Sequence, residues 1–189
     1  MLRVPVVLAL GLVFAPALTA QDKPTAAMLQ AVSGTWKLDP AHSDTVPADP
    51  MSRGAGPRGF SGGGSRGGGG ADPNLRLVMA EVNPGAGLVV AANDSTVAMA
   101  TANMLKANPN AVSNWKTDGK KYQDAQMDGT ITESQSGWRD GVLTIMYGVV
   151  GVGSFTREFK LGRDGKTLEL KETVLAGGRK AEYKLSFNR

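Results

Sequence analysis

The stretch "FTREFKLGRDGKTLELKETVL" at residues 155–175 decides the fold. Apolar and polar residues alternate on both sides of Asp164-Gly165, a dipeptide typical of the tight turns that join antiparallel strands. Such a turn fixes the register, so the facing pairs follow from counting outward from it. Apolar residues then face apolar residues, and Arg157 faces Glu172. This agreement predicts a hairpin whose apolar side also carries one pair of opposite charges.

The second half of the chain repeats this pattern of strand and turn. Further turn dipeptides stand at Asp118-Gly119, Asp128-Gly129, Asp140-Gly141 and Gly177-Gly178. Connections this short join neighbouring antiparallel strands, so we expect an up-and-down meander. Upstream, strands are expected at 34–39, 75–82 and 87–92. Residues 94–107 suit either a strand or a short helix capped by Asp94 or Ser95.

Counting from the neighbouring turns extends the enclosed face over more strands. The turn at 177–178 places Tyr183 opposite Glu172, and a three-residue loop at 150–152 places Ile145 opposite Arg157. The turn at 140–141 brings further hydroxyl groups to the same face. The candidate ligand-binding residues on this face are Arg157, Glu172, Tyr183, Tyr147, Ser134 and Ser136.

Two interpretations of the Arg157–Glu172 pair stay open. In the first, it is a structural ion pair whose remaining hydrogen bonds are satisfied by Tyr183 and water. In the second, the face lines a partly polar cavity in which Arg157 meets an acidic or carbonyl-bearing ligand.

The N-terminus has the pattern of a secretory signal. Arg3 precedes an apolar run at 4–15 that is too short to span a membrane as a mature helix, and small residues follow it. We therefore expect residues 1–20 to be removed on export, which leaves no membrane anchor. The chain has no cysteine, which fits the bacterial periplasm or exterior and excludes disulfides. Residues 21–33 are expected to form an N-terminal arm with one or two helical turns.

Residues 51–71 are a low-complexity stretch of glycine, serine and arginine. Such a stretch buries too little apolar surface to offset its ordering entropy, so we expect a disordered, flexible insertion. Its arginines resemble an RNA-binding segment, but a surface insertion is the favoured interpretation in an exported chain. The whole chain has a formal net charge of +4, and the charges outside this stretch are interleaved in sign and do not indicate a nucleic-acid-binding surface. A single domain at 34–189 interrupted by this insertion is expected.

Catalytic and metal-binding patterns are missing from the sequence. His42 is the only histidine and stands in a polar loop, and zinc sites need several His or Cys ligands. Neither an activated nucleophile nor a general acid–base pair stands out. We therefore expect no enzyme activity, no metal and no cofactor.

Gly34-Thr35-Trp36, placed ahead of a β-meander, resembles the Gly-x-Trp opening of the lipocalins and the wider calycin barrels. Together with "GWRDGVLTI" and "LGRDGKTLELKETV", the stretch "GTWKLDPAHS" is similar to small secreted bacterial lipocalin-like proteins, most of them uncharacterised. The resemblance implies an all-β antiparallel meander closing into a lipocalin-like barrel. It also implies that Trp36 plugs one barrel end beneath an arginine of the last strand, either Arg189 or Arg179. Trp138 is expected to be structural too.

The resemblance implies an exported, non-catalytic protein that holds a small apolar or amphipathic ligand. Apolar walls would hold the body of the ligand, and Arg157 would orient its polar end. The alternative is a protein-binding module, such as a periplasmic protease inhibitor or an envelope-assembly factor, with residues 21–33 as its arm.

Overall fold

The computed structural model describes residues 23–46, 84–176 and 178–189. The signal segment at 1–20, the insertion at 51–71 and the strand expected at 75–82 lie outside the described residues. One antiparallel sheet contains ten strands in the described part, in the order β4-β3-β2-β1-β10-β9-β8-β7-β6-β5. The strands are β1 (Gly34–Leu38), β2 (Gly87–Ala92), β3 (Thr96–Thr101), β4 (Ser113–Lys116), β5 (Lys121–Ala125), β6 (Ile131–Arg139), β7 (Val142–Val149), β8 (Gly153–Leu161), β9 (Thr167–Ala176) and β10 (Arg179–Asn188).

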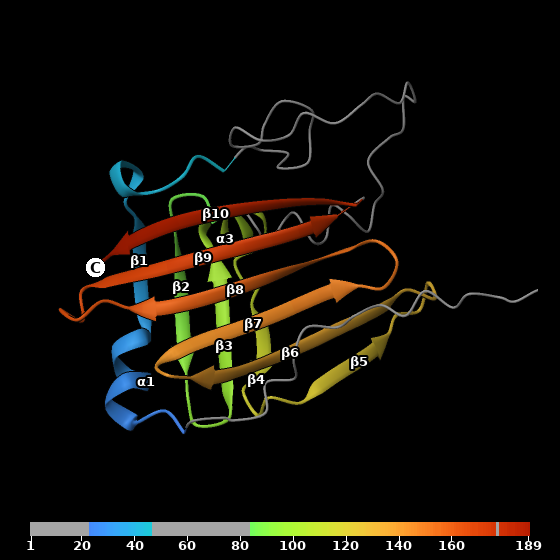
Figure 1. Cartoon of the computed structure of the whole chain (residues 1–189), viewed down its shortest axis with the longest axis horizontal. Helices are drawn as coiled ribbons and strands as arrows, with labels where there is room; N and C mark the ends of the chain where they lie inside the picture. Colours follow the sequence, from blue (N-terminus) through green and yellow to red (C-terminus); the bar gives the residue numbers. More distant parts are fainter. Residues whose placement is uncertain (1–22, 47–83, 177) are drawn as a thin grey trace, which may run out of the picture.

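The sheet curls into two layers. Strands β5–β10 run diagonally across the front of the molecule, and β1–β4 cross them behind (Figure 1). The layers are joined where β1 pairs with β10 through Lys37–Asn188 and Leu38–Phe187. At the opposite side the ladder is not continuous among the described residues. There β4 meets β6 instead, because Ser136 Oγ donates to Lys116 O over 2.7 Å.

The predicted register of the C-terminal meander is confirmed on every strand from β6 to β10. Glu172 pairs with Arg157 on one side and with Tyr183 on the other. Ile145 pairs with both Arg157 and Ser136. The all-β, up-and-down arrangement expected from the turns is therefore the arrangement of this chain.

The geometry of two turns explains why the strand register could be predicted by counting residues outward from them. Asp140 and Gly141 both have positive φ angles, 49° and 77°, as a two-residue turn that follows the strand twist requires. The loop at Asp164 is longer than two residues. Gly162 N donates to Thr167 O, and the Asp164 carboxylate accepts from the backbone N–H groups of Lys166 and Thr167. The loop is longer by one residue on each side of Asp164-Gly165, so its centre and the register of the strands are unchanged.

Residues 94–107 contain both a strand and a helix. Strand β3 ends at Thr101, whose side chain accepts from Met104 N over 3.1 Å and caps α3 (Ala102–Ala107). The expected caps Asp94 and Ser95 are wrong. Both lie in the β2–β3 turn, where the side chain of Asn93 accepts from the backbone N–H of Ser95.

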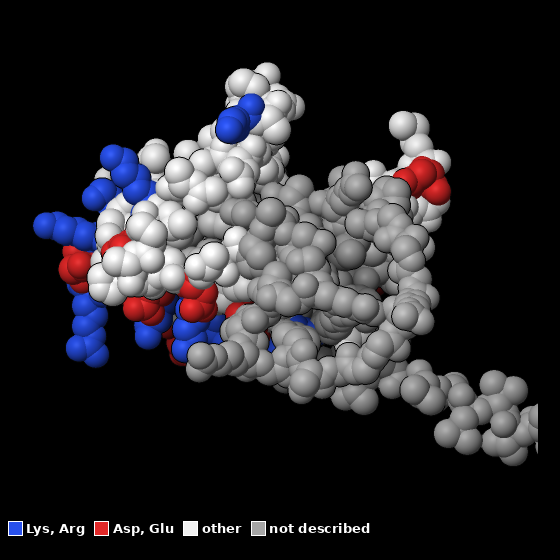
Figure 2. All heavy atoms as spheres, turned by 90° about the horizontal axis from the view of Figure 1, so that it is seen from above, with Lys and Arg blue, Asp and Glu red and all other residues white. Residues whose placement is uncertain are grey.

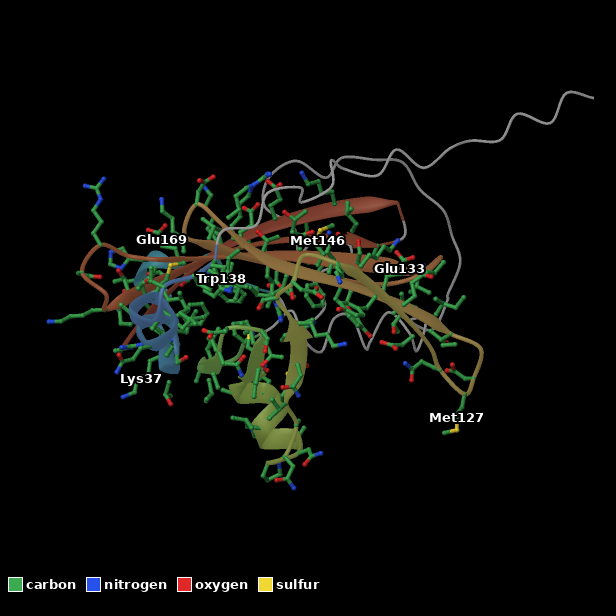
Figure 3. The ribbon with its side chains drawn as sticks, turned by 90° about the horizontal axis from the view of Figure 1, so that it is seen from below. Lys37, Met127, Glu133, Trp138, Met146 and Glu169 are labelled. Carbon is green, nitrogen blue, oxygen red and sulfur yellow. The ribbon has the colours of Figure 1, made fainter. Side chains whose placement is uncertain are left out.

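The described residues ahead of β1 contain one short helix, α1 (Ala26–Val32), capped by Thr25. Leu29 and Val32 on this helix are buried in the core. Most of the core lies between the two layers of the sheet, where side chains from both fill the interior (Figure 3). Outside, acidic and basic side chains are intermingled on the described part of the face in Figure 2, in agreement with the interleaved charges of the sequence.

Candidate functional site

A polar row crosses the inner side of the front layer. It runs over five neighbouring strands, from β6 to β10, as Ser136, Ile145, Arg157, Glu172 and Tyr183. All five are buried, with at most 3% of the surface of any one exposed. The row is flanked along the strands by large apolar side chains, so it is a polar strip inside the core.

The centre of the row is an ion pair. Arg157 Nε donates to Glu172 Oε1 over 2.8 Å, with 3% of the arginine and none of the glutamate side chain exposed. The guanidinium also lies 4.5 Å from the ring centroid of Phe155, which contacts Tyr147 in turn. Burying two charges is tolerable only with such close pairing, because each ion loses its hydration. The arrangement fixes Arg157 in one orientation.

Tyr183 lies next to the glutamate, and its hydroxyl has no hydrogen-bond partner among the described residues. Burial, and secondarily the negative charge of Glu172, raise the pKa of Tyr183 above its ordinary value. The phenol is therefore protonated at any physiological pH and can donate. Trp138 on β6 presents a second buried donor, its indole Nε1–H, that likewise has no partner in the described part. The indole lies in the interior between the layers (Figure 3).

The other predicted ligand-binding residues are placed less centrally. Ser136 is buried, but its hydroxyl is used at the β4–β6 contact described above. Ser134 and Tyr147 pair with each other one step further along the strands and are only half-buried. Arg157, Glu172 and Tyr183 are therefore brought together, and Ser134 and Tyr147 form the outer margin of the row.

Trp36 on β1 is buried between α1 and the last residue of the chain. Only 1% of it is exposed, and its Nε1 donates to Val32 O of α1 over 2.9 Å. The guanidinium of Arg189 lies 4.4 Å from its ring centroid and donates to Ser33 O over 2.7 Å and to Ala31 O. Of the two arginines that the resemblance left open, Arg189 covers the ring. Trp138 is also buried, opposite Leu143, but its indole N–H has no partner in the described part of the chain, a polar feature that its interpretation as a structural residue did not include.

His42 takes no part in the interior. It belongs to a short 3₁₀ turn, η1 (Pro40–His42), and its exposed ring lies 2.8 Å from the Asp39 carboxylate. The hydrogen bond from His42 lowers the pKa of Asp39. Ser43 and Asp44 bind the backbone of β10 instead. Among the residues that the structure describes, no group of three or more His, Cys, Asp or Glu could hold a metal ion.

Comparison with known proteins yields distant structural likenesses only. No family model and no curated protein matches the sequence. Two solved structures are similar, each at 12% sequence identity. Fatty-acid-binding protein 1 of Echinococcus granulosus has a TM-score of 0.40, and the match covers 85% of this chain and 98% of that chain. A Schistosoma mansoni fatty-acid-binding protein in complex with arachidonic acid has a TM-score of 0.41, and the match covers 86% of this chain and 98% of that chain. The fold described above stands on the strand pairing alone. No helix in the described ranges is long and apolar enough to cross a membrane.

Proposed function

We propose that the protein is a non-catalytic binding protein that holds one small apolar or amphipathic ligand inside its curled sheet. One observation carries this proposal: the hydroxyl of Tyr183, in a residue that is 1% exposed, has no partner among the described residues. A buried donor without an acceptor costs about 1–3 kcal/mol. A ligand with an acceptor atom at this point would recover that free energy, and the Arg157–Glu172 pair would orient its polar end.

The surroundings of the polar row suit the body of such a ligand. The inward side chains one step along the strands on either side are mainly apolar. They are Phe155, Val174 and Ala181 on one side, and Leu143, Phe159, Leu170 and Leu185 on the other.

Export is part of the proposal. The signal pattern at 1–20 and the lack of cysteine support a periplasmic or secreted protein that carries no anchor once the signal is cleaved. Expression of the full chain in a Gram-negative bacterium, followed by intact-mass measurement of the periplasmic fraction, tests this. A product that keeps residues 1–20, or that stays in the cytoplasm, would contradict it.

Native mass spectrometry of the exported protein tests ligand binding. We expect an added mass that is released by organic extraction. Tyr183→Phe should reduce the retained fraction, whereas Tyr122→Phe should not, because the hydroxyl of Tyr122 donates to Asp118 on the exposed surface. Protein that carries no ligand, and that takes up none from a lipid extract, would refute the binding proposal.

A protein-binding module is the second candidate, and one surface favours it. Ile131 and Val150 are 43% and 54% exposed and adjacent, since Val150 N donates to Ile131 O over 2.9 Å. Met127 is fully exposed at the nearby β5–β6 turn and points away from the sheet (Figure 3). Apolar side chains grouped in this way are typical of contact surfaces. Ile131→Lys would impair this function and leave ligand retention unchanged.

A further inference from the structure

Resting on the proposed function, we infer that the interior site selects an uncharged ligand bearing a hydrogen-bond acceptor, such as an ester or a ketone, over the carboxylate of the same chain length. The inference comes from the juxtaposition of a buried, mutually neutralising Arg157–Glu172 pair with the buried donor of Tyr183.

Charge balance is the first step. Among the described residues, Arg157 and Glu172 are the buried charged side chains, and they bind each other directly. The positive charge of the arginine is therefore already matched by the glutamate. A ligand carboxylate would enter as a second anion beside Glu172 and share one cation with it. The ligand carboxylate would lose its hydration, and it would have to share the charge of Arg157 with Glu172 in return.

The chemistry of the unsatisfied groups is the second step. Tyr183 is held protonated by burial and by its glutamate neighbour, and the Trp138 indole N–H can only donate. Both groups can therefore donate a hydrogen bond to an acceptor atom of the ligand, and neither carries a positive charge. A carbonyl or ether oxygen accepts such a hydrogen bond and brings no net charge into the core. Glu172 beside Tyr183 makes the position unfavourable for a second anion but not for a neutral oxygen.

Three probes of one chain length test the inference on the mature wild-type protein: dodecanoate, methyl dodecanoate and dodecane. Binding is measured at neutral pH by tryptophan fluorescence, since Trp138 is buried in the interior. We expect the ester to bind at least about tenfold more tightly than the carboxylate, and several-fold more tightly than the alkane, which lacks an acceptor. Tyr183→Phe should remove most of the advantage of the ester over the alkane, with the Trp138 indole as the remaining donor, and Tyr122→Phe should not.

The outcomes separate this inference from the proposed function. Equal or tighter binding of dodecanoate overturns the inference and leaves the binding function standing. Equal binding of ester and alkane also overturns it, because no acceptor is then recognised. Binding of none of the three, together with an empty protein in native mass spectrometry, overturns both. Glu172→Gln adds a check, because it removes the negative charge beside Tyr183 and should move the preference toward dodecanoate by about tenfold or more.

Discussion

Replacing Tyr183 by phenylalanine should make the ligand-free protein more stable. The substitution removes one oxygen atom from a residue that is 1% exposed and whose hydroxyl has no partner among the described residues. No hydrogen bond is lost, and the desolvation cost of the buried hydroxyl, about 1–3 kcal/mol, is relieved. The small void left by the oxygen offsets part of this gain. We therefore expect a net stabilisation of about 1 kcal/mol, which raises Tm by about 2–4 °C for a chain of this size.

Urea unfolding followed by circular dichroism measures this effect on protein freed of lipid by organic extraction. The matched control is Tyr122→Phe, which removes a hydroxyl that donates to Asp118 over 2.6 Å and lowers the pKa of that carboxyl. The control should be slightly destabilised. If Tyr183→Phe instead lowers the free energy of unfolding by 1 kcal/mol or more with an unchanged m-value, the hydroxyl has a partner in the folded protein. The observation that carries the proposed function would then be lost.

Three further substitutions test other parts of the structure. Glu172→Gln leaves the Arg157 charge buried without its counter-ion and should cost about 3–5 kcal/mol in urea unfolding; a loss below about 1 kcal/mol would mean that the pair is hydrated. Arg189→Ala removes the guanidinium over Trp36 and its bonds to two carbonyl groups, so we expect a loss of about 2 kcal/mol and a red shift of tryptophan emission; unchanged emission would contradict the clamp. Thr101→Ala removes the cap of α3 and should cost about 1 kcal/mol, measured by thermal unfolding, with Thr96→Ala at the other end of β3 as the comparison.

The register of the C-terminal meander could be predicted because its causes are local. Each turn between β6 and β10 joins neighbouring strands through a connection of known parity, so the partner of every side chain follows from counting. The sequence alone therefore places Arg157, Glu172 and Tyr183 in one row. Even the longer loop at Asp164 kept the register, because it is extended by one residue on each side of the predicted turn.

Features that depend on distant parts of the chain could not be predicted in the same way. The pairing of β1 with β10 involves no turn, so nothing local showed which arginine would reach Trp36. Residues 94–107 were ambiguous because Thr101 ends a strand and caps a helix at once. Whether the Tyr183 hydroxyl and the Trp138 indole find partners among the described residues depends on how far the sheet curls, and strand patterning carries no information on curvature.

The clamp formed by Arg189 has a consequence for the order of folding. Ala31 and Arg189 are 158 positions apart, so the contact between them closes almost the whole length of the chain. The hairpins from β6 to β10 close only short loops and can assemble early, whereas β1 and α1 must wait for a long-range encounter. Until then the apolar residues of α1 and the indole of Trp36 are open to other molecules. The slow stage of folding should therefore be the docking of the N-terminal segment onto the preformed hairpins.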